Sequence, residues 1–458
     1  MLSEYRQRFG QFHTELHRET YLFRSGRKTH NETAHIFSEY SDLFRLSAVE
    51  ELRAKLADTS EYRETETTSL RRLISFALEN HLPAQVRDLS AEIEDIEARA
   101  DRVAEDLRAE RLQKLHAGAR ALGYENYLAM RGKLQEVDIE KLAAQANQFL
   151  AKTESRYVSA LAPLLLREAN VSLDEATAAH LKHLRQYARF DAFFERERML
   201  GVYRELFAAL GFRTENQTNV EIDSATRPNK QPHAFCAPVR VPDEIKLAAN
   251  LVGGQANYRE FLRAAGHTQH FAWTSRNLYP EFQRSGDAAV GAAWGMLFEN
   301  LLLDSTWLTG TFGFVENAEF RHALAATRLM ELRRRAAKLN YEIEVHSGKL
   351  ADGAEKRYVE LMADAVRVRF DEAEHLRDLS DDFRPAIFLR AAVFEAQLRD
   401  HLKTKFGSRW WASRKAGEML IDLWNTGRRY SVEALAVMIG LGELDFELLL
   451  TDFGKLNV

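Results

Sequence analysis

Three side chains in the second half of the chain have the types and spacing of a candidate metal or catalytic site. Arg263, His267 and His270 follow one another at intervals of four and three residues, so in a helix they share one face. The two imidazoles could supply two ligands to a metal ion. The same spacing also fits a pair of histidines that bond to neighbouring groups or to water.

Other reactive or aromatic residues favour structural roles. Cys236 lies in an apolar stretch with no Cys-His-Asn signature, which indicates a small buried side chain rather than a nucleophile. His233 is interpreted as a surface histidine rather than a contact for a bound chain. Trp410 and Trp411 favour the core over ligand stacking. His346 is a candidate for a histidine lining a cleft.

Composition restricts the class of protein. The 458 residues correspond to about three domains at typical domain length. The 63 basic and 68 acidic residues give a net charge of −5, so we expect neither nucleic-acid nor membrane partners. The single cysteine excludes a disulfide within the chain. The N-terminal residues lack the apolar core of a signal peptide, and we expect a cytoplasmic location.

Charged and glycine-rich motifs offer no nucleotide site. The densest basic cluster (Arg333, Arg334, Arg335 and Lys338) lies in a helical pattern beside Glu331 and is interpreted as a solvated face. No glycine-rich phosphate loop of either common type is present, so a nucleotide cofactor has no support.

Periodicity and turn residues predict a mainly helical chain with one small β-sheet. Only 23 glycines and 8 prolines are present, which indicates long elements. Residues 1–210 form an N-terminal helical lobe, with one long helix over 90–122, a capping box of Ser172 and Glu175, and Gly211 ending the last helix. Prolines and short β-type stretches over 211–254 predict edge strands. Residues 255–458 return to helix, with a second capping box at Asn257 and Glu260.

The second half of the chain, from about Asn219, resembles the thimet oligopeptidase and oligoendopeptidase F group of zinc metallopeptidases, which are of gluzincin type. The resemblance rests on PHAFCAPVRVPDE from Pro232, Gly253-Gly254, AGHTQHFA from Ala265, FQRSGD from Phe282, Phe298-Glu299 and FEAQL from Phe394. It implies a neurolysin-type zincin fold, with two intertwined helical lobes around a deep cleft and the edge of the small sheet facing that cleft.

The resemblance also implies that the zinc site is degenerate. The family helix carries His-Glu-x-x-His, in which the histidines bind zinc and the glutamate activates water. At these positions the chain has Arg263, Ala264 and His267, and the family's third ligand, a glutamate on a following helix, falls on Ala292. Arg384 and Phe388 stand where relatives place tyrosines that can bond an oxyanion. No catalytic residue and no zinc are therefore expected.

Arg263 introduces a permanent positive charge where the family holds a dication. A buried guanidinium needs a carboxylate partner, and Asp287 and Glu299 are the candidates in the resembling region. We hypothesise that Arg263 replaces zinc as the cation around which the site is organised. The alternative is an Arg263 side chain that extends into a hydrated channel. The predicted cleft residues are Arg263, His267, His270, Asp287, Glu299 and His346.

The sequence therefore predicts a catalytically inactive homologue of a zinc oligopeptidase. Such a protein could bind a peptide or a protein partner in the cleft, for example by strand addition to the edge of the sheet. Two alternatives stay open. One is an active metallopeptidase with His267, His270 and Glu299 as displaced ligands. The other is a purely structural or assembly role beside an active paralogue.

Overall fold

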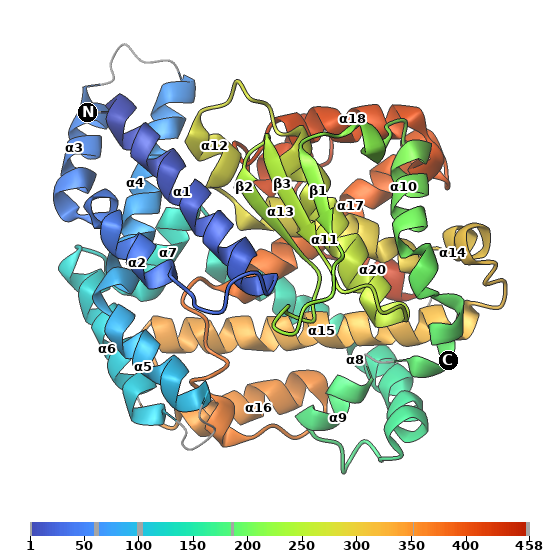
Figure 1. The fold of residues 1–458 in the computed structure, drawn as a ribbon. Helices are drawn as coiled ribbons and strands as arrows, with labels where there is room; N and C mark the ends of the chain where they lie inside the picture. Colours follow the sequence, from blue (N-terminus) through green and yellow to red (C-terminus); the bar gives the residue numbers. More distant parts are fainter. Residues whose placement is uncertain (1, 59–63, 99–103, 185–186, 351, 455–458) are drawn as a thin grey trace. The chain divides into compact units, whose positions relative to one another are not determined.

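Helices make up most of the chain, and one three-stranded sheet accompanies them (Figure 1). The computed structural model describes residues 2–58, 64–98, 104–184, 187–350 and 352–454. The predicted mainly α fold with one small β-sheet is confirmed. None of the described helices combines the length and the hydropathy that a bilayer crossing demands.

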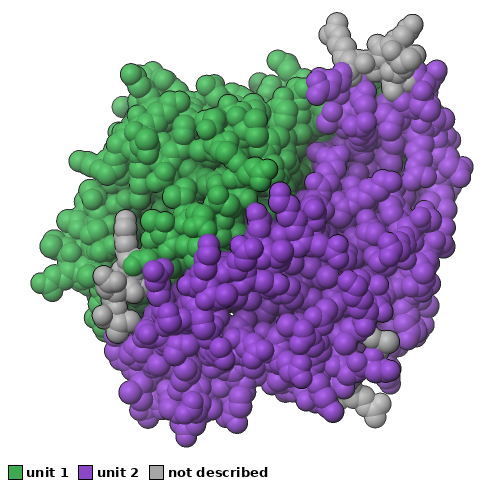
Figure 2. Space-filling view, turned by 180° about the vertical axis from the view of Figure 1, so that it is seen from behind, with its two compact units in different colours: residues 1–40, 183–327, 390–457 green, residues 41–182, 328–389, 458 purple. Residues whose placement is uncertain are grey.

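The chain divides into two compact units, which Figure 2 shows in two colours. Unit 1 comprises residues 1–40, 183–327 and 390–457, and unit 2 comprises residues 41–182, 328–389 and 458. Both units are therefore assembled from separate segments, whereas the sequence suggested three regions (1–210, 211–254 and 255–458) with two intertwined helical lobes. The change from one unit to the other falls within two long helices, α15 (Ala318–His346) and α17 (Arg384–Phe406).

Unit 1 holds the sheet and the helices that carry the predicted site. Its helices are α1 (Leu2–Arg24), α2 (Thr33–Glu39), α10 (Met199–Ala209), α11 (Gln255–Trp273), α12 (Pro280–Arg284), α13 (Ala288–Glu299), α14 (Ser305–Phe312), α18 (Arg414–Asn425), α19 (Val432–Met438) and α20 (Glu447–Gly454). Unit 2 contains α3 (Leu46–Ala57), α4 (Glu64–Gln85), α5 (Arg87–Ala98), α6 (Glu105–Ala121), α7 (Tyr127–Gln135), α8 (Ile139–Ala169), most of α9 (Ala178–His183) and α16 (Ala354–Val366).

The sheet has the order β1-β3-β2 and is irregular, as the prolines predicted. Strand β1 (Val220–Asp223) runs parallel to β3 (Glu244–Ala248), and β2 (Phe235–Arg240) runs antiparallel to β3. The register of β2 shifts between Pro238 and Arg240. Pro238 cannot donate to a ladder, and it lies in an edge strand, where one side of the backbone has no strand partner to supply.

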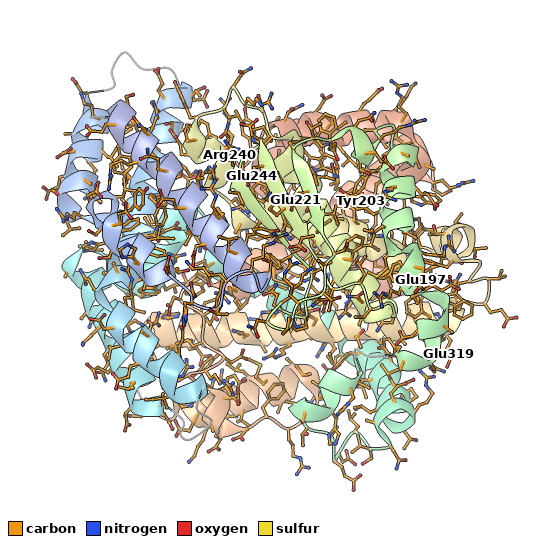
Figure 3. The ribbon with its side chains drawn as sticks, in the orientation of Figure 1. Glu197, Tyr203, Glu221, Arg240, Glu244 and Glu319 are labelled. Atoms are coloured by element: carbon orange, nitrogen blue, oxygen red, sulfur yellow. The ribbon has the colours of Figure 1, made fainter. Side chains whose placement is uncertain are left out.

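The two faces of the sheet differ in chemistry. Charged side chains pair across the strands, with Lys246 Nζ 2.7 Å from Glu221 and Arg240 Nε 3.1 Å from Glu244; Figure 3 labels Glu221, Arg240 and Glu244. Apolar side chains, among them Ile245 and Val241, pack with Phe271 of α11. The sheet therefore packs against α11 through these apolar side chains, and Ala237 and Ala248 form a second buried cluster with Tyr21 of α1.

A buried aromatic cluster packs against α13. Trp294 and Trp424 lie with ring centroids 6.1 Å apart, and Phe298 lies 6.4 Å from Trp410. All four are inaccessible to solvent, and Trp411 is 7% exposed. The prediction that Trp410 and Trp411 belong to the core is confirmed.

The predicted solvated face of α15 is wrong. Arg333 is 1% exposed and Lys338 is 7% exposed. Arg333 donates to the carbonyl oxygens of Ala365 and Leu150 and pairs with Glu154. Arg334 and Lys338 both pair with Asp378, at 2.8 and 3.0 Å. Long-range carboxylates satisfy these cations, and such partners cannot be read from a local charge run.

Two predicted helix starts are also wrong, although one predicted end is confirmed. The hydroxyl of Ser172 donates to Glu175, but these residues form a turn ahead of α9. Asn257 lies inside α11, whose first amide donates to Asp191 at 2.8 Å. Helix α10 ends before Gly211, which has φ +100°. The helix predicted over 90–122 is divided between α5 and α6, and residues 99–103 lie outside the described part of the chain.

Candidate functional site

Helices α11 and α13 pack with their backbones almost in contact, and glycines allow this. A Cβ at Gly266 would lie 2.3 Å from the carbonyl oxygen of Trp294, a distance that real side chains do not reach. A Cβ at Gly295 would lie 2.8 Å from Nε2 of His267 and 2.9 Å from Cγ of Arg263. The glycine face of α13 therefore lies directly against the predicted site residues of α11.

Arg263 makes the carboxylate contact expected of it. Its Nη2 lies 2.5 Å from Oε2 of Glu299, the last residue of α13, and Arg259 approaches the other oxygen at 3.6 Å. The side chain of Arg263 is 40% exposed and that of Glu299 is 13% exposed. Of the two predicted partners, Glu299 is confirmed and Asp287 is wrong.

Asp287 lies at the start of α13 and bonds to other groups than Arg263. It accepts from the amides of Ala289 and Val432, and its two oxygens receive two guanidinium nitrogens of Arg390 at 2.9 and 2.7 Å. Arg390 also pairs with Glu433. Asp287 thus caps α13 and fixes it to α17 and α19, which is a structural role.

His267 lies between Arg263 and the glycine face of α13. Burial, followed by the charges of Arg263 and Arg428, lowers the pKa of His267 to about 3. The imidazole is therefore neutral at physiological pH. A Cβ at Gly291 would lie 3.4 Å from Nδ1 of His267 and 3.1 Å from Nη2 of Arg428, so this arginine is a close neighbour of the ring.

His270 points elsewhere and is committed to the backbone. It is fully buried, and its Nε2 lies 3.0 Å from the carbonyl oxygen of Gly427. Since a carbonyl only accepts, Nε2 carries the proton and donates. Burial and the charge of Arg428 lower the pKa of His270 to about 3. The neighbouring Gln269 donates to the hydroxyl of Tyr203 on α10, which Figure 3 labels.

Ala264 and Ala292, which the sequence analysis matched to the base and the third ligand of the resembling family, bring no functional group. Ala264 is 3% exposed and Ala292 is a partly exposed residue of α13. Neither methyl group can accept a proton or bind a metal. Their matching to the family motif stays a prediction from the sequence.

Three predicted residues belong to unit 2 or to its part of α17. His346 is fully buried, with Nδ1 3.0 Å from His116, and burial lowers its pKa to about 3. Arg384 is 73% exposed and pairs with Asp382 at 3.3 Å. The ring of Phe388 lies beneath the guanidinium of Arg335. His346 is thus a histidine bonded within the core of its unit.

The remaining minor predictions have clear outcomes. His233 is a surface histidine, 72% exposed, with Nδ1 2.7 Å from Glu260. Cys236 is only partly exposed, and burial raises the pKa of its thiol to about 12. A thiol with so high a pKa is not a nucleophile at neutral pH. Both structural interpretations are confirmed.

Sequence reasoning missed four basic residues that surround His267 and His270. Arg428 lies near both of them and also near His13 and His17 on α1, and Arg284 lies near the two histidines of α1. Burial and the two arginines lower the pKa of His17 to about 3. The sequence contained one signal for His13 and His17: they are four residues apart, on a helix that also carries Phe9 and Phe12. The nearness of α1 to α11 has no local signature.

The residues of this site do not fit a zinc ion. In the described part of the chain, no three histidine, cysteine or carboxylate side chains are grouped so as to hold a metal. Glu299 is engaged by two guanidinium groups and His270 by a backbone carbonyl, so the displaced set His267, His270 and Glu299 is not assembled. A guanidinium at 263 would also repel a dication.

Comparisons with known proteins agree with the fold. No family model matches the chain, and no curated protein matches it. A solved structure of a Pyrococcus furiosus carboxypeptidase, described as apo-Mg, is similar with a TM-score of 0.70 and 15% sequence identity. The match covers 99% of this chain and 97% of that one. The two chains thus share a fold over nearly their whole length. The narrower likeness to oligoendopeptidase F stays a prediction.

Proposed function

We propose that this protein is a catalytically silent relative of zinc peptidases that binds a peptide or protein partner without cleaving it. The observation that carries the proposal is the ion pair of Arg263 with Glu299 at the position where the family places its first zinc-binding histidine. A fixed cation there opposes a dication and supplies no lone pair.

The alanine at the predicted position of the base supports the same proposal. General base catalysis contributes typically about 10² to 10⁴-fold in rate, and the methyl group of Ala264 cannot provide it. The neutral His267 cannot replace this base, since a pKa of about 3 makes it a very weak proton acceptor. The two changes affect separate parts of one mechanism.

The contacts of Arg284 argue against a partner that binds by adding a strand to the sheet. This residue donates to the carbonyl oxygens of Pro238 and Val239 in the edge strand β2, at 3.4 and 3.2 Å. Strand addition along this part of β2 would have to break those bonds. We therefore favour binding through side chains of the site over extension of the sheet.

Metal content and peptide cleavage test the proposal directly. Wild-type protein purified without chelators should contain well below one zinc per chain by elemental analysis, and should leave a quenched fluorescent peptide library intact. The variant R263H/A264E/A292E should take up zinc. Stoichiometric zinc in the wild type that disappears in His267→Ala, together with cleavage, would contradict the proposal.

A matched control shows whether zinc uptake depends on the positions of the new ligands or only on their number. The variant R259H/A264E/A292E carries the same number of new ligands, with the histidine one helical turn earlier and also beside Glu299. It should not bind zinc. If both variants are folded by circular dichroism and neither takes up zinc, the assignment of positions 263, 264 and 292 is wrong.

A further inference from the structure

We propose that an arginine–histidine cluster in unit 1 is a binding site for a small oxyanion of the phosphate or carboxylate class. The cluster consists of His13, His17, His267, Arg284 and Arg428. This inference adds a class of ligand to the proposed function. It rests on the proposed function because it requires that no metal cation is bound beside His267.

Contacts between four elements bring the cluster together. Arg284 donates to the hydroxyl of Thr14 on α1 at 3.1 Å, between the two histidines of that helix. Arg428 Nη1 approaches the carbonyl oxygen of Arg284 at 3.4 Å. The rings of His13 and His17 stack with centroids 5.9 Å apart. Helices α1, α11 and α12 and the segment after α18 therefore converge on one place.

The two arginines have no carboxylate partner within salt-bridge distance among the described residues, a feature that distinguishes them from Arg263 and Arg390. Arg284 bonds only the neutral oxygens of Thr14, Pro238 and Val239. Arg428 has that single 3.4 Å bond and lies over the ring of Phe271, and its Nε is buried without a partner. Such guanidinium groups are costly to enclose unless an anion completes them.

The charges that act on the imidazoles near the cluster are all positive. The charged groups that shift the pKa of the four imidazoles of His13, His17, His267 and His270 are arginines or other histidines. Asp287 is the carboxylate that acts on Arg428, but its hydrogen bonds go to Arg390 and to two backbone amides. The positive potential is therefore left unbalanced, which favours an anion.

The cluster is partly accessible to solvent: both ring nitrogens of His13 and Nε of Arg428 are buried, but each residue keeps some exposed surface. His13, His17, His267, Arg284 and Arg428 are each partly exposed, neither fully buried nor on the open surface. Neutral imidazoles can donate one N–H each to an oxyanion, and the guanidinium groups can donate two at once. Arg284 and Arg428 use only some of their N–H groups in hydrogen bonds to the described residues.

Calorimetry on the full-length protein tests the inference. Inorganic phosphate and acetate, titrated separately at low ionic strength, distinguish a phosphate ligand from a carboxylate ligand, and acetamide serves as the neutral control. We expect one site for at least one of the two anions and none for acetamide. Arg428→Met or Arg284→Met should weaken binding by about tenfold or more, because charge-assisted hydrogen bonds are lost. Arg276→Met removes an exposed arginine paired with Asp243 and should leave binding unchanged.

Thermal stability gives a second readout that does not depend on heats of binding. In anion-free buffer, Arg428→Met should raise the melting temperature, since it removes an uncompensated cation. Phosphate or acetate should raise the melting temperature of the wild type but not that of the variant. Failure of both anions to bind or to stabilise the wild type overturns the inference. Zinc content is measured separately, so a failure of the proposed function is recognised on its own.

Discussion

The ion pair of Arg263 with Glu299 can be measured by a double-mutant cycle of Arg263→Met and Glu299→Gln. Two unit charges about 4 Å apart at an effective dielectric constant near 20 attract by about 4 kcal/mol. Because Arg263 is 40% exposed, solvent screening and side-chain ordering reduce this, and we expect a net coupling of about 1–2 kcal/mol. Glu299→Gln should cost more than Arg263→Met, because Arg259 also loses its carboxylate.

Urea unfolding followed by tryptophan fluorescence is the assay. All six tryptophans lie in unit 1, so the signal reports the unit that contains the ion pair. High salt should reduce the coupling, since the pair is partly exposed. The pair of Arg276 and Asp243, at 2.7 Å and with side chains 71% and 49% exposed, is the control and should couple by less than about 1 kcal/mol. A coupling for Arg263 no larger than that of the control would refute our reasoning and favour an arginine that extends into water.

Three further predictions concern packing and titration. Gly266→Ala should destabilise unit 1 by about 2 kcal/mol or more, because its Cβ would clash with the backbone of α13, whereas Gly310→Ala, with open space around it, should be neutral or stabilising in urea unfolding. Burial raises the pKa of Glu342 to about 8, so its folded form keeps a proton that the unfolded chain releases near pH 4.5. Its contribution to stability is therefore fully present below about pH 4.5 and lost as the pH rises to 8. The free energy of unfolding of Glu342→Gln should rise relative to that of the wild type by a few kcal/mol over that range. Equal pH profiles of unfolding, followed by circular dichroism, would contradict this. Cys236, with a pKa of about 12, should react slowly with iodoacetamide at pH 8 in the folded protein and rapidly in urea, and equal rates would show that the thiol is not protected.

The sequence predicts those features of the fold that depend on local pattern. Few glycines and prolines indicated helices, and the prolines between 228 and 242 indicated an edge strand, which Pro238 confirms. The ends of the helices were predicted less accurately. Asn257 and Glu260 have capping-box spacing, but the cap of α11 comes from Asp191, more than sixty residues away. A local rule cannot detect a distant cap that competes with it.

The candidate site was only partly predictable for a similar reason. Glu299 could be named as a candidate partner of Arg263 because the resemblance placed Asp287 and Glu299 near the cleft. The pairing of Asp287 with Arg390 could not, because α17 lies about one hundred residues further on. The basic run on α15 was predicted to be solvated because its partners, Glu154 and Asp378, are far away in the sequence. Ion pairs between remote segments are set by tertiary packing, which sequence spacing does not encode.

The glycines between α11 and α13 separate the shape of this region from its chemistry. Gly266 and Gly295 set how closely the two helices approach, while positions 263, 264 and 292 of the same helices carry the side chains of the predicted site. Substitutions at the second group leave the first untouched. The side chains at those positions can therefore change while the architecture persists, and the framework remains available for new recognition to evolve.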